Sequence, residues 1–167
     1  MKVFDEKFRN NKIRYVLQCL LAAVSVFIIL LFLNAISDAV IVAALGASAF
    51  IAFAMPEAQV SRPRFLIGGY LVGIAVGWPC YRLSLIPTLA SLPVVNECSD
   101  VIFGALAVGL SIFIMVVTDT EHPPAAGLAL GLTVGECTHR TILVALIGIV
   151  SLSIVKRVLR PVLRNLL

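Results

Sequence analysis

A polar stretch between two apolar segments carries the residues best suited to chemistry. This central stretch covers residues 118–131, and its chemically distinctive members are Asp119, Glu121, His122, Pro123 and Pro124. Adjacent prolines favour the first turn of a helix, where a missing N–H costs nothing. A short helix that begins inside a membrane exposes backbone N–H groups and the positive end of its dipole, and both attract anions. The central stretch therefore predicts an anion site at a helix N-terminus.

His122 is the candidate for the central role at this site. Its imidazole titrates near neutral pH, so it can donate a hydrogen bond to an anion or shuttle a proton. We expect Asp119 and Glu121 beside it, and a Thr118 or Thr120 side chain capping the helix. The alternative is that His122 and these acids form a hydrogen-bonded turn at the membrane surface and bind no substrate.

Three residues outside the central stretch are expected to join it. Ser48 lies among small residues in another short apolar segment, and it is the hydroxyl expected to face the central stretch, unless it bonds to its own helix. Arg62 and Arg64 are expected either to gather anions at the mouth of a path or to anchor a loop to lipid headgroups. The candidate substrate-binding set is His122, Pro123, Pro124, Ser48, Asp119, Glu121, Arg62 and Arg64.

The composition defines the solvent around most of the chain. Of the 167 residues, 60% are hydrophobic and 13% are charged, and the mean hydropathy is +1.06. Such values are typical of integral membrane proteins, so the expected environment is a lipid bilayer. The net charge of +4 does not indicate a nucleic-acid partner, because the Lys and Arg residues concentrate at the two ends of the chain.

Six apolar segments account for nearly the whole chain. The four long segments are residues 15–33, 65–81, 101–117 and 141–155, and the two short ones are 39–55 and 123–134. Pro79 and Arg82 are expected to interrupt the third segment near its end. The pattern predicts an all-α polytopic bundle of transmembrane helices, forming one domain over residues 1–167.

The basic ends of the chain predict its topology. Residues 1–14 and 156–167 fit the positive-inside rule, which places both termini in the cytoplasm. The expected location is the plasma (inner) membrane. Six crossings put Arg62 and Arg64 inside as well, whereas four crossings with re-entrant short segments put them outside. The charge distribution therefore favours six crossings, and no cleaved signal peptide is expected before the first one.

A weak internal repeat divides the chain into two halves. A shift of 81 positions aligns Asp38 with Asp119, and it places one short segment on the other. The halves, about residues 15–86 and 99–158, each read as long, short and long. An odd number of crossings in each half would invert the second half, a plan that recurs in transporters with the substrate site between the halves.

Other chemistries have weaker support. Glu136, Cys137 and His139 lie close together and, with Cys98, form a candidate soft-ligand set for a metal-dependent enzyme, but the spacing matches no structural metal motif. Cys98 and Cys137 are also candidates for a disulfide. No nucleophile with a base at useful spacing and no phosphate-binding glycine loop is visible. We therefore expect no metal, no cofactor and no enzymatic activity.

Three motifs resemble those of the HPP family of integral membrane proteins, which is named for its His-Pro-Pro motif. Over about residues 14–155 the matching residues are Glu121-His122-Pro123-Pro124-Ala125-Ala126, Gly46-Ala47-Ser48-Ala49, and Pro63-Arg64 followed by Gly68-Gly69. The resemblance implies four transmembrane segments, as the family is usually described. It also implies a link to nitrite transport, which is associated with photosynthetic members. By similarity, His122, Pro123, Pro124 and Ser48 would carry the family's signature role.

The working hypothesis is a transporter or channel for a small anion, with nitrite as the first candidate. His122 would be a polar or protonatable gate, and Arg62 and Arg64 would attract the anion. A bundle this small has little interior, so a homo-oligomer is expected. The rival is a non-transporting scaffold or assembly subunit. A transporter requires His122 and Ser48 to face a shared polar cavity, whereas a scaffold lets them point at neighbouring groups.

Overall fold

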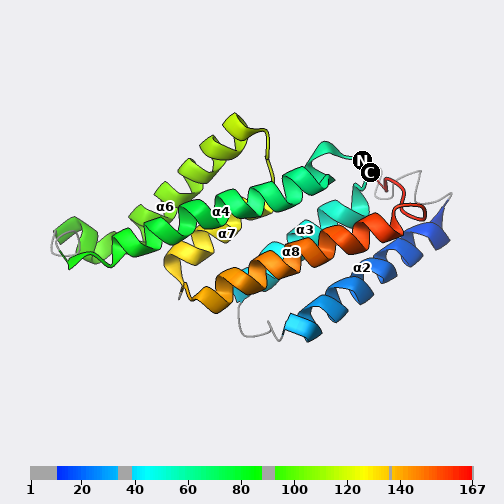
Figure 1. Ribbon diagram of the computed structural model, residues 1–167, viewed down its shortest axis with the longest axis horizontal. Helices are drawn as coiled ribbons and strands as arrows, with labels where there is room; N and C mark the ends of the chain where they lie inside the picture. The colour runs from blue at the N-terminus through cyan, green and yellow to red at the C-terminus, as the bar shows by residue number, and fades with distance from the viewer. Residues whose placement is uncertain (1–10, 34–38, 88–92, 136, 167) are drawn as a thin grey trace, which may run out of the picture.

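The computed structural model describes residues 11–33, 39–87, 93–135 and 137–166, and these residues form helices and connecting turns without a strand. The long helices are α2 (Lys12–Leu33), α4 (Pro63–Ser84), α6 (Pro93–Thr118) and α8 (His139–Leu159), the short ones are α3 (Ala39–Ala54) and α7 (Pro123–Val134), and η1 (Gln59–Ser61) is a 3-10 turn before α4 (Figure 1). The all-α class and the division into four long and two short segments are confirmed.

Two helix boundaries differ from the sequence-based expectation. α4 continues through Pro79 and ends only at Ser84, because a helix surrounded by lipid keeps its backbone groups bonded within itself. α6 begins at Pro93, well before the fourth apolar segment, and it bends at Cys98, whose φ of −127° and ψ of 24° are not helical. Residues 93–100, which precede the fourth apolar segment, are therefore helical.

The helix lengths separate the four long helices from the two short ones. α2, α4, α6 and α8 each contain a stretch long and apolar enough to cross a membrane. α3 and α7 have 16 and 12 residues, which gives ~24 Å and ~18 Å and falls short of a hydrocarbon layer of about 30 Å. Four long spans agree with what the HPP resemblance implies. The expectation of six crossings stays a prediction.

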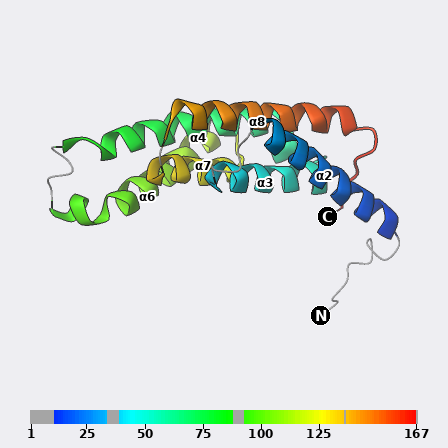
Figure 2. The ribbon, with the colours of Figure 1, turned by 90° about the horizontal axis from the view of Figure 1, so that it is seen from below.

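Helix packing repeats in the two halves of the chain. α2 and α6 lie on opposite sides of the bundle, and each packs against the short helix of its own half, α3 and α7 respectively (Figures 1 and 2). Each short helix also packs against the last long helix of the other half, α3 against α8 and α7 against α4, and the two short helices contact each other. Exchanging the halves leaves this list of helix contacts unchanged, and the internal repeat itself stays a prediction. The inverted relation between the halves stays a prediction.

α4 and α7 approach each other closely along a row of glycines. A Cβ added to Gly69 would lie 2.5 Å from Cβ of His122, and one added to Gly73 would lie 2.6 Å from the carbonyl oxygen of Ala125. The two helices therefore run parallel, and α7 begins beside a residue six positions after Pro63, or ~9 Å along α4. Glycine at these positions lets His122 lie within the bundle rather than at its end.

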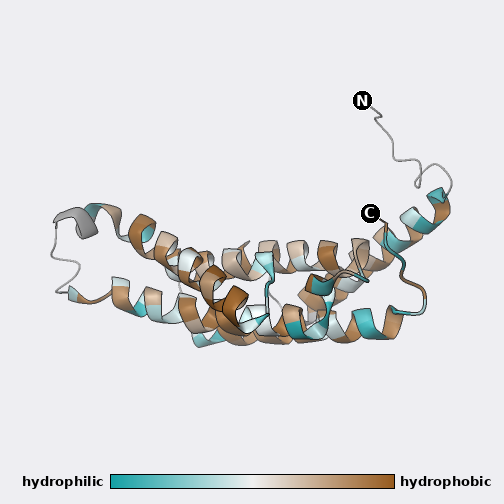
Figure 3. Ribbon diagram, turned by 90° about the horizontal axis from the view of Figure 1, so that it is seen from above, coloured by the Kyte–Doolittle hydropathy of each residue, from teal (hydrophilic) through white to brown (hydrophobic). Residues whose placement is uncertain are grey.

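The surface of the bundle is apolar along its length and polar at one end. Leu17, Phe27 and Phe113 are examples of large apolar side chains that are exposed, as expected for residues that face lipid. Hydrophilic residues gather toward the end where the C-terminal segment lies (Figure 3). There Gln18 of α2 donates from Nε2 to the carbonyl oxygen of Arg164 at 2.6 Å. The two ends of the described chain thus lie at the same end of the bundle, and its cytoplasmic orientation stays a prediction.

Candidate functional site

A buried hydrogen-bond network joins the two short helices to α4 and η1. Oγ of Ser48 on α3 lies 2.9 Å from Nε2 of His122 and 3.0 Å from the hydroxyl of Tyr70 on α4. Nδ1 of His122 lies 3.3 Å from the carbonyl oxygen of Val60 in η1. Ser48, Tyr70 and His122 are all 0% exposed. The fold therefore brings together Ser48 and His122, which the sequence singled out although 74 residues separate them.

The partners of His122 define the direction of each hydrogen bond. A carbonyl oxygen only accepts, so Nδ1 of His122 carries the proton and donates to Val60. Nε2 then accepts from the Ser48 hydroxyl, which in turn accepts from the Tyr70 hydroxyl. Burial lowers the pKa of His122 to about 4, and the bond to Val60 opposes this shift only in part. His122 is therefore a neutral imidazole at neutral pH.

The His-Pro-Pro motif sets the start of α7. His122 has an extended backbone, with φ of −140° and ψ of 97°, and the two prolines occupy the first turn as predicted. Pro123 and Pro124 have no N–H, and the N–H of Ala125 donates to the carbonyl oxygen of His122 at 2.9 Å. The first turn of α7 thus offers few free backbone donors. An anion bound here would depend on side chains more than on the helix N-terminus.

The predicted threonine cap of α7 is wrong. His122 is the residue that precedes the helix, and no side-chain cap is formed. The hydroxyl of Thr118 donates instead to the carbonyl oxygen of Ile114 at 2.7 Å, within α6, and lies 2.8 Å from the hydroxyl of Thr120. The reason is that Thr118 still belongs to α6, where a threonine hydroxyl readily bonds the preceding turn.

The acids of the central stretch make no hydrogen bond to His122, and Asp119 pairs with Arg64 instead. Nη2 of Arg64 lies 3.3 Å from Oδ2 of Asp119 and donates to the carbonyl oxygen of Thr118 at 3.0 Å. Asp119 has a φ of 54°, a left-handed conformation that aspartate tolerates better than most residues. Glu121 is half-buried and makes no side-chain hydrogen bond or ion pair within the described part of the chain. Arg64 therefore fastens the loop between α6 and α7 to α4.

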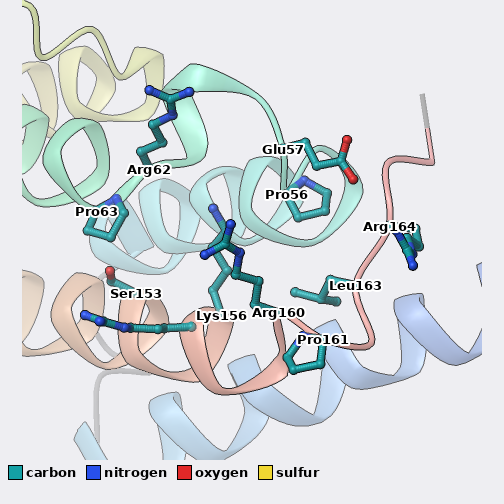
Figure 4. Close-up of a pocket in the computed structure, with 11 residues that line it drawn as sticks. Pro56, Glu57, Arg62, Pro63, Ser153, Lys156, Arg160, Pro161, Leu163 and Arg164 are labelled. Atoms are coloured by element: carbon teal, nitrogen blue, oxygen red, sulfur yellow. The ribbon is translucent and has the colours of Figure 1, made fainter.

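A cationic cavity opens beside η1 and the end of α8. It has a volume of about 1050 Å³, and we call it the basic cavity. Its charged lining residues are Arg62, Lys156, Arg157, Arg160, Arg164 and Glu57. Lys156 of α8 and Arg160, which directly follows α8, lie on one side of the cavity, Pro63 and Arg62 lie across from them with the Arg62 guanidinium pointing away from both, and Glu57 lies at one end (Figure 4). The basic tail was read from the sequence only as a topology signal, so this cavity was missed.

The turn η1 connects the basic cavity to the buried network. Val60 accepts from His122, the carbonyl oxygen of Ser61 accepts from Nζ of the buried Lys156, and Arg62 lines the cavity. Oγ of Ser61 is buried and has no hydrogen-bond partner among the described residues. The polar groups of Val60, Ser61 and Arg62 therefore form a chain of polar groups from the cavity to His122.

The alternative roles of the cysteines and the second histidine find little support. Cys98 and Cys137 are both free thiols, so the disulfide considered from the sequence is not formed. Glu136 of the candidate metal set lies outside the described residues. Among the residues that are described, no three His, Cys, Asp or Glu side chains converge on a common point.

The fold and this site define a polytopic helical membrane protein with a buried histidine at the start of a short helix. The family model for the transmembrane region of HPP proteins matches residues 8–165. The chain therefore belongs to the HPP family, as its three motifs indicated.

The comparisons with known proteins identify a relative that shares part of this chain. A transmembrane protein from Dictyostelium discoideum is 37% identical over 91 residues, which cover 54% of this chain and 29% of that protein. The chain thus spans less than a third of the curated relative that it matches. No solved structure matches the chain.

Proposed function

We propose that this HPP protein is a transporter or channel for a small monovalent anion, with nitrite as the first candidate. The observation that carries the proposal is the chain of polar groups that runs from the basic cavity through η1 to His122 and Ser48. These two side chains meet where the short helices of the two halves contact each other. In transporters built from two such halves, the substrate site lies at this position.

The basic cavity is the proposed mouth of the path. A concave surface lined by cations raises the local concentration of anions and so speeds their entry. Arg62 fits the predicted role of attractor because it lines the cavity. Arg64 fits it less well, because its guanidinium is held by Asp119. The mouth therefore uses Arg62 together with cations of α8 that the sequence did not single out.

The proposed gate is the hydrogen bond between Ser48 and His122. In the arrangement seen in the structure, which we call closed, both side chains form their hydrogen bonds with other groups of the protein. Protonating Nε2 of His122 removes the lone pair that accepts from Ser48, so this hydrogen bond must reverse, with Nε2–H donating and the Ser48 hydroxyl hydrogen released from His122. Nε2–H and the freed hydroxyl can then both donate to the oxygens of an anion. Opening is therefore expected to become easier as the pH falls.

A scaffold or assembly role remains the second candidate. The observation that favours it is that Ser48 and His122 are fully buried and point at neighbouring protein groups, which is the arrangement expected of a scaffold. A network of this kind can specify how α3, α4 and α7 pack without binding any substrate.

Nitrite uptake into proteoliposomes tests the transport proposal. The intact protein is expected to take up nitrite faster than empty liposomes, and to take up sulfate more slowly because sulfate carries two charges. Ser48→Ala is expected to change the rate of nitrite uptake. The matched control Ser111→Ala is expected to leave the rate unchanged, because the Ser111 hydroxyl bonds only to Val108 of its own helix. Uptake no faster than in empty liposomes, with folded protein, would favour the scaffold role.

A further inference from the structure

The basic cavity is larger and more charged than a small anion requires. Its lining has five cationic side chains and one carboxylate, a formal excess of four positive charges. Nitrite carries a single negative charge and only three atoms, so it would neutralise a small part of this excess. A cavity of about 1050 Å³ is instead comparable to pockets that enclose ligands of drug-like size.

The cations of the cavity have few partners of their own. Within the described residues, Arg62, Arg157 and Arg160 make no ion pair, although Glu57 lies in the same cavity. The Glu57 carboxylate instead accepts from Nδ2 of Asn165 at 3.4 Å. Clustered like charges repel one another, so this arrangement is most stable when an anion with several charges or oxygens occupies it.

Lys156, which lines the cavity, and its hydrogen-bond partner Ser61 behind it are buried polar residues with unused hydrogen-bonding capacity. Lys156 is only 8% exposed, and its ammonium group donates to the carbonyl oxygen of Ser61 with one of its three N–H bonds. Oγ of the neighbouring Ser61 is buried without a partner among the described residues. A buried hydroxyl without a partner is costly unless a water or a ligand oxygen bonds to it.

We propose that the basic cavity binds a phosphate-bearing anion. The guanidinium groups of Arg157 and Arg160 would hold the phosphate oxygens in the forked geometry that arginine favours, and Arg62 would close the site from the side of α4. Lys156 would supply a buried positive charge beneath the phosphate. This assignment goes beyond anion transport and does not depend on it.

The position of the cavity indicates a lipid headgroup as the source of the phosphate. Arg62 directly precedes Pro63, the first residue of one candidate span, and Arg160 directly follows Leu159, the last residue of another. Lipid phosphates lie at this depth, and basic pockets between membrane helices commonly bind anionic headgroups. A soluble phosphate ester or inorganic phosphate would use the same contacts, so the experiment must separate the two sources.

The test compares three probes on the full-length protein in a neutral detergent. The probes are short-chain phosphatidylglycerol, short-chain phosphatidylcholine and inorganic phosphate, and bound ligand is counted by native mass spectrometry. The cavity variant is Arg157→Gln with Arg160→Gln. The matched control, Arg82→Gln with Arg140→Gln, removes the same number of charges at the opposite ends of α4 and α8. Thermal unfolding in the same detergent verifies that both variants are folded.

The expected result is that phosphatidylglycerol binds, that phosphatidylcholine binds much more weakly, and that only the cavity variant loses binding, by about tenfold or more. Binding of inorganic phosphate with the same dependence on the cavity arginines would support the site and identify a free anion as its source. Equal binding of both lipids, or binding unaffected by the cavity variant in a folded protein, would overturn the proposal.

Discussion

The buried network and the basic cavity lie next to each other but differ in charge, in burial and in how far their polar groups have protein partners. Val60 belongs to the first and Arg62 to the second, two residues apart. In the network, every polar side-chain atom has a protein partner, and the side chains are buried and neutral. In the cavity, five cationic side chains share one lining with a single carboxylate, and most of the cations are exposed. The network can act on a ligand only after it opens, whereas the cavity is ready to receive one.

Forcing α4 and α7 apart is expected to break the network most severely. In Gly69→Ala the added methyl group would lie 2.5 Å from Cβ of His122, so we expect a loss of about 3 kcal/mol in the free energy of unfolding. Gly46→Ala is the matched control, because nothing lies within 4 Å of its added methyl group and alanine favours a helix. Denaturant unfolding in detergent measures both. Equal stability of the two variants would contradict the close packing.

Acid is expected to weaken the network while leaving the cavity charged. The pKa of His122 is about 4 in the folded protein and 6.5 when unperturbed, so protons favour the unfolded chain between these values. The stabilisation is complete above the unperturbed pKa, and about 2 kcal/mol of it is lost by pH 5.

Histidine variants isolate this pH dependence from that of the carboxylates. His122→Gln is expected to flatten the fall in unfolding free energy between neutral pH and pH 5, whereas His139→Gln, at an exposed position, is expected to keep it. If the unfolding free energy falls equally steeply with pH in both variants, His122 does not titrate in the way its burial implies.

Removing the Ser48 hydroxyl, which bridges Tyr70 and His122, is expected to lower the unfolding free energy by somewhat less than acid does. Ser48→Ala leaves the Tyr70 hydroxyl and Nε2 of His122 buried without their common partner, which should cost about 1.5 kcal/mol in unfolding free energy. Ser111 is equally buried, but its hydroxyl bonds only within its own helix. Ser111→Ala is therefore expected to cost clearly less, and a larger cost for Ser111→Ala than for Ser48→Ala would count against the network.

Removing a positive charge from the cavity is expected to stabilise the protein, whereas the substitutions in the network are expected to destabilise it. Arg160→Gln removes one charge from a cluster of cations, so the protein in a neutral detergent without phosphate should become more stable, by at most about 0.5 kcal/mol. Arg140→Gln, at the other end of α8, should have no measurable effect. A clear destabilisation by Arg160→Gln would show that this arginine is already satisfied by the protein.

The sequence was sufficient to predict the helices and one contact between them. Apolar runs interrupted by charged residues marked all six helices, because lipid demands long uncharged segments. The two prolines after His122 marked the start of α7, because proline is tolerated only in a first turn. Ser48 was expected to face His122 because it is a lone hydroxyl among small apolar residues.

The partners of the network and the whole cavity could not be predicted in this way. Tyr70 bonds to Ser48, and Val60 bonds to His122, in a network that forms because Gly69 lets α7 lie against α4. The cavity combines Arg62 with the end of α8 and the C-terminal segment, which are about a hundred residues apart. Neither feature has a local sequence pattern, because both depend on how distant helices pack.

Nitrite uptake by His122→Ala and His139→Ala tests the central claim most directly. The two variants remove the same side chain, one from the buried network and one from an exposed position. At equal reconstitution, His139→Ala is expected to take up nitrite at the rate of the intact protein, and His122→Ala at a rate altered by about tenfold or more. If the two variants transport nitrite equally well, His122 is not the gate.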